Sequence, residues 1–144
     1  MTPTLPEIMT SFAVTLGTPL PPESSGDYMA GRAGMLTMLS MLAAQEAQRG
    51  PAARVWENGA IRDMLGKAAG AYDAAMGGAL ARAAGETDTD FTWSGLDAAN
   101  AALRRLLIAL HEKVEEAGDN NLDREIIGLY REMAYARRLE LAGG

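Results

Sequence analysis

The chain has one histidine, His111, and no cysteine, so the side chains that most often bind metals or act as nucleophiles are scarce. A di-iron helical bundle needs two Glu-x-x-His motifs and two further glutamates, but the residue three positions before His111 is Ile108. The same count excludes a three-histidine zinc site and any thiolate site. We therefore expect no metal and no cofactor.

An acidic segment has the spacing of a calcium-binding loop. Glu86, Asp88 and Asp90 alternate with threonine, as carboxylates do at the start of an EF-hand loop. The sixth position, however, is Phe91 where an EF-hand needs glycine, and the twelfth is aspartate rather than glutamate. We interpret the segment as a solvated loop that Phe91 and Trp93 hold against the protein.

Methionine recurs every third residue at Met35, Met38 and Met41, and each is followed by leucine. On a helix, which advances about 100° per residue, the apolar side chains of this segment cover roughly 220°. An ordinary surface helix needs an apolar arc of only about 100° or a little more. We interpret these methionines as gap-filling core residues rather than as Cu(I) ligands. The wide arc indicates either several neighbouring helices or contact with a second copy of the chain.

A group of polar residues interrupts the apolar faces near Gly50. If the segments on either side of Gly50 form an antiparallel hairpin, Glu46 lies beside Arg54, and Asn58 and Arg62 follow at four-residue spacing. We expect these four side chains to cluster at the closed end of the hairpin. They would either hold a polar ligand or form an ion-pair network where the bundle meets water.

His111 shares the apolar face of its helix with Asn100, and a second hairpin about Asp119 would set Gly128 opposite it. Such a histidine either packs in the core or acts in acid–base chemistry. No Gly-x-Ser-x-Gly motif and no glycine-rich phosphate loop after a strand is present, so we name no catalytic residue. The candidate ligand-binding residues, between the two hairpins, are Tyr28, Arg32, Tyr72, His111, Tyr130 and Arg137.

These residues must be positioned by helices, because no segment alternates in the manner of a strand. Thr4 and Glu7 form a capping-box pattern, which predicts a short helix over 5–16, and the prolines that come next indicate a tether. The pattern predicts an all-α fold, with an N-terminal helical arm and tether at 1–26 and an up-down-up-down four-helix bundle at 27–144. The expected bundle helices are 27–49, 51–84 with a break near Gly77 and Gly78, 94–118, and 122–141.

Composition limits the class of protein. The 144 residues are 48 % apolar and 22 % charged, which is typical of one globular domain. A net charge of −6 disfavours nucleic acid as a partner. The longest uncharged run near the methionines is shorter than the ~20 residues of a membrane span, and the N-terminus lacks the basic start of a signal peptide. We expect a cytoplasmic protein that does not enter a membrane.

Three hypotheses for function remain. The first is a non-catalytic interaction protein that acts as a homodimer or binds another protein, because no catalytic constellation is visible. The second is a small-molecule-binding bundle that uses the residues between the hairpins. The third is an enzyme that uses His111 with a carboxylate that the sequence does not identify. Fold alone does not separate them.

Overall fold

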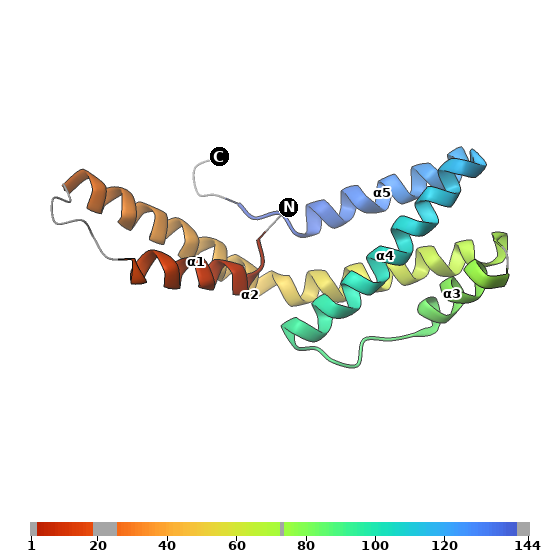
Figure 1. Cartoon of the computed structure of the whole chain (residues 1–144), viewed down its shortest axis with the longest axis horizontal. Coiled ribbons are helices and arrows are strands. Elements are labelled where there is room, and N and C mark those ends of the chain that lie inside the picture. Colours follow the sequence, from red (N-terminus) through yellow and green to blue (C-terminus); the bar gives the residue numbers. More distant parts are fainter. Residues whose placement is uncertain (1–2, 19–25, 73, 141–144) are drawn as a thin grey trace. The chain divides into compact units, whose positions relative to one another are not determined.

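The computed structural model describes residues 3–18, 26–72 and 74–140, and in them the chain is helical without strands. The chain divides into two compact units: unit 1 comprises Met1–Gly50 with Arg137–Gly144, and unit 2 comprises Pro51–Ala136. The all-α class is confirmed, while the division at residue 26 stays a prediction. The elements are α1 (Leu5–Gly17), α2 (Gly26–Ala68), a 3-10 turn η1 (Ala69–Ala71), α3 (Ala74–Gly85), α4 (Trp93–Ala117) and α5 (Asn120–Ala136) (Figure 1).

The N-terminal arm is the helix that its capping pattern predicts. The backbone N–H of Thr4 donates to Glu7 Oε2 at 2.7 Å, which satisfies one of the donors left free at a helix start. The hydrogen bonds from the Thr4 backbone and hydroxyl hold the pKa of Glu7 below its usual value. The proline-rich part of the predicted tether, 19–25, lies outside the described residues.

The expected turn at Gly50 is wrong. α2 continues through Gly50 and Pro51, with the proline inside the helix, so the chain does not fold back there. A proline in a helix interior removes one backbone hydrogen bond and costs about 3 kcal/mol, which is why the sequence pattern suggested an end. The flanking residues offset this cost, since alanine-rich segments favour helix on both sides. The predicted antiparallel hairpin of 27–49 with 51–84 is therefore wrong, because both segments belong largely to one helix.

The chain does turn further on, at η1, which precedes the predicted break at Gly77 and Gly78. Gly77 is buried in α3, and a Cβ atom there would lie 2.5 Å from the Ala69 carbonyl oxygen. Real side chains cannot approach backbone that closely. The glycine pair thus does not break the helix. Gly77 instead lets the first turns of α3 pack directly against η1.

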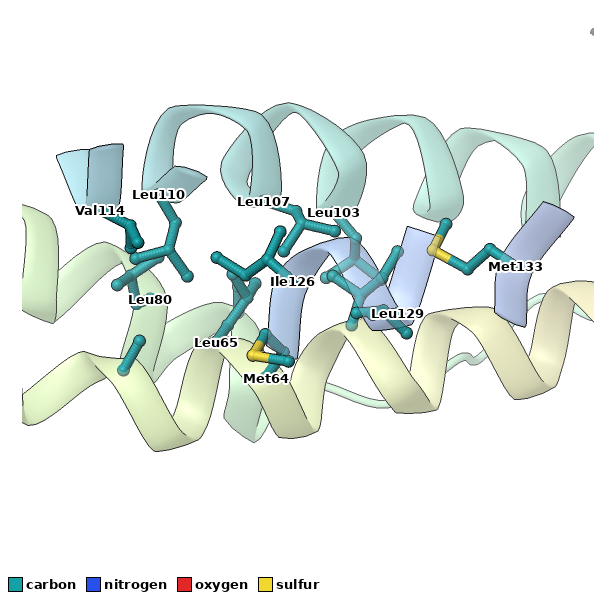
Figure 2. Close-up of a cluster of buried hydrophobic side chains, with 13 residues drawn as sticks. Met64, Leu65, Leu80, Leu103, Leu107, Leu110, Val114, Ile126, Leu129 and Met133 are labelled. Carbon is teal, nitrogen blue, oxygen red and sulfur yellow. The ribbon is translucent and has the colours of Figure 1, made fainter. Parts of the chain in front are cut away.

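Unit 2 has a continuous apolar core formed by the second part of α2 together with α3, α4 and α5. Figure 2 shows the side chains of α4 directed toward those of α2 and α5. The apolar spacing of this helix predicts that Leu96, Leu103, Leu107, Leu110 and Val114 share a face with Asn100 and His111. All are buried except His111, which is partly exposed. On α5 the structure buries Ile126, Leu129 and Met133. The core residues are Ile61, Met64, Leu65, Ala68, Leu80, Ala83, Leu103, Leu107, Leu110, Val114, Ile126, Leu129 and Met133.

The contact at Gly77 gives a test of this packing. Replacing Gly77 with Ala should lower the free energy of unfolding by about 1–3 kcal/mol, because η1 or α3 must shift to admit the methyl group. Gly78→Ala is the matched control. Nothing lies within 4 Å of a Cβ at Gly78, so alanine there should stabilise the helix by about 0.5–1 kcal/mol. Urea unfolding of both variants measures the difference, and equal effects would contradict the close approach.

Candidate functional site

Three of the four residues predicted as a polar cluster are brought together in unit 2. Arg54, Asn58 and Arg62 succeed one another at four-residue intervals on α2 and therefore face the same side. Arg54 and Asn58 are buried, and Arg62 is nearly so. The fourth residue, Glu46, is also buried but belongs to unit 1. The cluster forms around acidic partners from α4 and the preceding loop, not at the end of a hairpin.

Asp88 joins two of these side chains. Its carboxylate accepts a hydrogen bond from Arg62 Nη2 at 2.7 Å, and its two oxygens each lie 3.1 Å from Asn58 Nδ2. Burial alone would raise the pKa of Asp88. The hydrogen bonds from Arg62 and Asn58 and the positive charge of Arg62 outweigh that effect, so the pKa lies below its usual value. Asp88 is thus ionised near neutral pH and fixes the loop to α2.

Arg54 has the most buried positive charge in this network, at 1 % exposure. Its Nε donates to Asp97 Oδ1, in the first turns of α4. The guanidinium carbon also lies 4.3 Å from the centre of the Trp93 ring, a cation–π distance. Of the two aromatic residues expected to hold the loop, Trp93 therefore does so, whereas Phe91 is 65 % exposed.

The innermost part of the network is made of neutral amides and one carboxylate. Asn100 Nδ2 donates to Asn58 Oδ1 at 2.9 Å and to Glu57 Oε2 at 3.0 Å, and all three residues are buried. In the described part of the chain, Arg62 Nε is the buried side-chain nitrogen or oxygen that lacks a hydrogen-bond partner. Most of the polar atoms are thus paired within the chain, which favours the ion-pair interpretation over a ligand site.

Sequence reasoning missed the acidic half of this network. The sequence alone indicates a solvated loop at Asp88 and a helix start at Ser94 that includes Asp97. The helix starts earlier, because Thr92 is the N-cap and its hydroxyl accepts from Gly95 N at 3.1 Å. Buried arginines on an apolar helix face require carboxylates from another element. This requirement is the signal from which acidic partners for Arg54 and Arg62 could have been predicted.

The predicted ligand-binding residues are divided between the two units. Tyr28 and Arg32 lie in unit 1, where they line a pocket of about 450 Å³ together with residues of α1. Arg32 donates to the carbonyl oxygens of Thr15 and Thr18, the latter at 3.2 Å. A cation at these positions complements the C-terminal end of α1. The guanidinium therefore holds α1 beside α2 and forms part of the pocket wall.

In unit 2, the predicted ligand residue Tyr130 lies beside His111. The His111 and Tyr130 rings have centres 5.6 Å apart, and His111 Nε2 lies 2.8 Å from Asp123 Oδ1. Burial raises the pKa of both Tyr72 and Tyr130. The charge of Asp119 adds to the rise for Tyr72, whereas for Tyr130 the charge of Arg104 opposes it and that of Glu115 adds to it. Arg137 belongs to unit 1. A single site formed by all six residues stays a prediction.

The methionine-rich part of α2, in unit 1, is exposed rather than buried. Met35, Met38 and Met41 are 40–52 % exposed, and Tyr28 and Met29 are similar. Their interpretation as core residues within the chain is therefore wrong. In this unit the described neighbours of α2 are α1 and the segment at Glu140, whose backbone exchanges two hydrogen bonds with Gln45. They leave much of the wide apolar arc open.

Comparison with known proteins adds no functional assignment. No family model matches the chain, and neither a curated protein nor a solved structure is significantly similar to it. Among the residues that the structure describes, no helix combines the length and the apolar character needed to cross a membrane. The geometry of the chain is therefore the basis for any functional assignment.

The Asp88 network gives a stability prediction. Asp88→Asn should lower the free energy of unfolding at pH 7 by about 1.5–3 kcal/mol, the usual contribution of a hydrogen bond to a charged group. The pKa of Asp88 is lower in the folded than in the unfolded chain, where it is about 3.9. Its contribution is therefore present above about pH 4 and is lost as the pH falls through the folded value.

Chemical unfolding at pH 7 and at pH 3 measures both effects, and the gap between variant and wild type should narrow at pH 3. Asp90→Asn is the matched control in the same loop, because Asp90 is exposed and, among the described residues, accepts only from Thr92. An equal loss in both variants, or a gap that does not change with pH, would contradict the role of Asp88.

Proposed function

We propose that this chain acts without catalysis, through self-association or binding to another protein. The contact is the methionine face, defined as Tyr28, Met35, Met38 and Met41 on the first part of α2. The observation that supports it is the exposure of these four large apolar side chains, each at least 40 % accessible to solvent. Clustered apolar side chains at the surface of a folded protein typically mark an interaction site.

The chemistry of the methionine face suits a helical partner. Thioether side chains are flexible and polarisable, so they adapt to another apolar surface. No charged residue occurs between Arg32 and Glu46, so two copies of this face can meet without opposing like charges. A Cβ at Gly31 would contact nothing, which leaves room for close helix approach. The positions with the three- and four-residue spacing of paired helices are Tyr28, Gly31, Met35, Met38, Leu42 and Gln45.

A homodimer is the simplest form of this proposal. In a two-fold symmetric dimer the same patch meets itself, and the uncharged methionine face is compatible with that. The N-terminal arm lies at the same surface, since Val14 and Thr15 of α1 line the pocket that also contains Tyr28 and Met35. A dimer in which the two protomers exchange their arms is a second form of the same proposal.

The second candidate function is small-molecule binding, and the unit 1 pocket favours it. Its volume of about 450 Å³ lies within the range of about 300–1,000 Å³ found for ligand sites. The lining combines apolar side chains with the polar groups of Tyr28, Arg32 and two threonines. Such a site would take a small, mostly apolar molecule with one hydrogen-bonding end.

The dimer proposal predicts the effect of one charge on the methionine face. Met38→Glu should raise the dissociation constant for self-association about tenfold or more, equivalent to about 1.4 kcal/mol, because two carboxylates would be buried together. Ser40→Glu is the matched control. It adds the same charge at an exposed position about 200° further round the helix. Sedimentation of both variants over a range of concentrations measures the constants.

A wild-type chain that stays monomeric at all concentrations, or equal weakening by both variants, would contradict the homodimer. If the chain is a monomer that binds a second protein, and Met38→Glu weakens that binding, the result would support the protein-interaction form of the proposal. Circular dichroism checks that both variants keep their helix content.

The ligand proposal predicts a non-covalent adduct on the freshly purified protein. Native mass spectrometry should then give a mass above an integer multiple of the chain, and denaturation should release the difference. Tyr28→Ala should reduce the adduct, because it removes a wall of the pocket, whereas Tyr135→Ala, at an exposed position in unit 2, should not. A bare mass in the native spectrum would count against this candidate.

A further inference from the structure

Three potential ligand side chains meet at the α4–α5 hairpin of unit 2. His111 and Glu115 are four residues apart on α4 and so lie on one face, and Asp123 lies in the first turn of α5. One side-chain nitrogen or oxygen from each lies within 4.8 Å of the other two. These groups lie outside the methionine face, so ion binding at this hairpin would not depend on the proposed self-association.

The hairpin itself holds the three groups in place. α4 ends at Gly118, whose φ of 68° is the left-handed conformation that glycine adopts easily. Asp119 then accepts hydrogen bonds from the backbone of Asn121 and Leu122, both at 3.1 Å, and so starts α5. The tight turn brings Asp123 back beside His111, at 2.8 Å. The Tyr130 ring, packed against the imidazole, limits its rotation.

The donor set has the chemistry of a zinc site with open positions. One imidazole nitrogen and two carboxylate oxygens are ligands that Zn²⁺ accepts, with water completing the shell. An imidazole disfavours Mg²⁺ and Ca²⁺, which prefer oxygen throughout. In the described part of the chain the Glu115 carboxylate takes part in no side-chain hydrogen bond or ion pair, so coordination would not require it to leave a partner.

Local charge also favours a cation. The segment 111–123 carries five carboxylates, from Glu112, Glu115, Glu116, Asp119 and Asp123, against the single lysine Lys113. That lysine is engaged by Glu116 at 2.6 Å. The segment 111–123 therefore has excess negative charge at neutral pH, which a divalent ion would offset.

We infer that His111, Glu115 and Asp123 bind one Zn²⁺ ion per chain. The expectation of no metal was based on the scarcity of histidine and cysteine. It did not consider a site with one histidine and two carboxylates. Two of these ligands are adjacent on a helix, but the third is placed only by the hairpin. Bound zinc would tie the end of α4 to the start of α5.

The test uses the full, untagged chain after treatment with a chelator, because a histidine tag would itself bind zinc. Calorimetric titration with ZnCl₂ at pH 7.5 should give saturable binding of one ion per chain, and MgCl₂ should give none. At zinc concentrations about a hundredfold above the dissociation constant, Tm should rise by roughly 5–15 °C. Replacement of zinc by Co²⁺ should give a visible absorption band that reports nitrogen and oxygen ligands.

The decisive variants are Glu115→Gln and Asp123→Asn, which should each weaken zinc binding about tenfold or more. Glu116→Gln is the matched control, since it removes the same charge one residue away and is not part of the cluster. Glu115 and Glu116 are both exposed, so neither substitution threatens the fold. Absence of zinc binding to the wild type would overturn the inference. So would equal weakening by Glu115→Gln and Glu116→Gln, which would indicate only general attraction to an acidic surface.

Discussion

Burying a guanidinium group costs several kcal/mol unless anions and hydrogen-bond acceptors surround it, and unit 2 is arranged around this constraint. Arg54, almost wholly removed from solvent, requires Asp97 and the ring of Trp93, which fixes the start of α4 against α2. Two turns along, Arg62 requires Asp88, which fixes the loop before α4. The same helix contributes Ile61 and Leu65 to the apolar core of unit 2.

The two parts of α2 have opposite surroundings although they form one helix. Beyond Pro51 the helix contributes Ile61, Leu65 and Ala68 to a buried core, whereas the segment before it exposes the methionine face. Exposed thioether and tyrosine side chains lose the stabilisation that burial would give, at about 25 cal/mol for each Å² of apolar surface. A surface of this kind is best explained by a partner that covers it, which is the reason for proposing an interaction protein.

The two polar clusters of unit 2 differ in how their charges are balanced. Around Arg54 and Asp88 the charges are paired with opposite charges from the same chain, which suits a structural role. In the segment 111–123 the anions exceed the cations, and the Glu115 carboxylate lies within 4.8 Å of that of Asp123. A network closed on itself has little capacity for a ligand, whereas an incomplete one with a fixed imidazole can accept an ion. This difference separates a fold-stabilising cluster from a candidate binding site.

The sequence by itself determined the all-α class, the N-terminal helix and most of the buried face of α4, because local capping and the 3.6-residue period depend on near neighbours. Thr4 and Glu7 predicted α1, and the spacing of leucines about Asn100 predicted that face correctly. Only the tertiary structure decided that α2 passes through Pro51, that Asp88 and Asp97 pair with the arginines, and that Asp123 reaches His111. Those outcomes depend on residues far apart in the chain, whose burial and charge compensation outweigh the local preference of a proline or an aspartate.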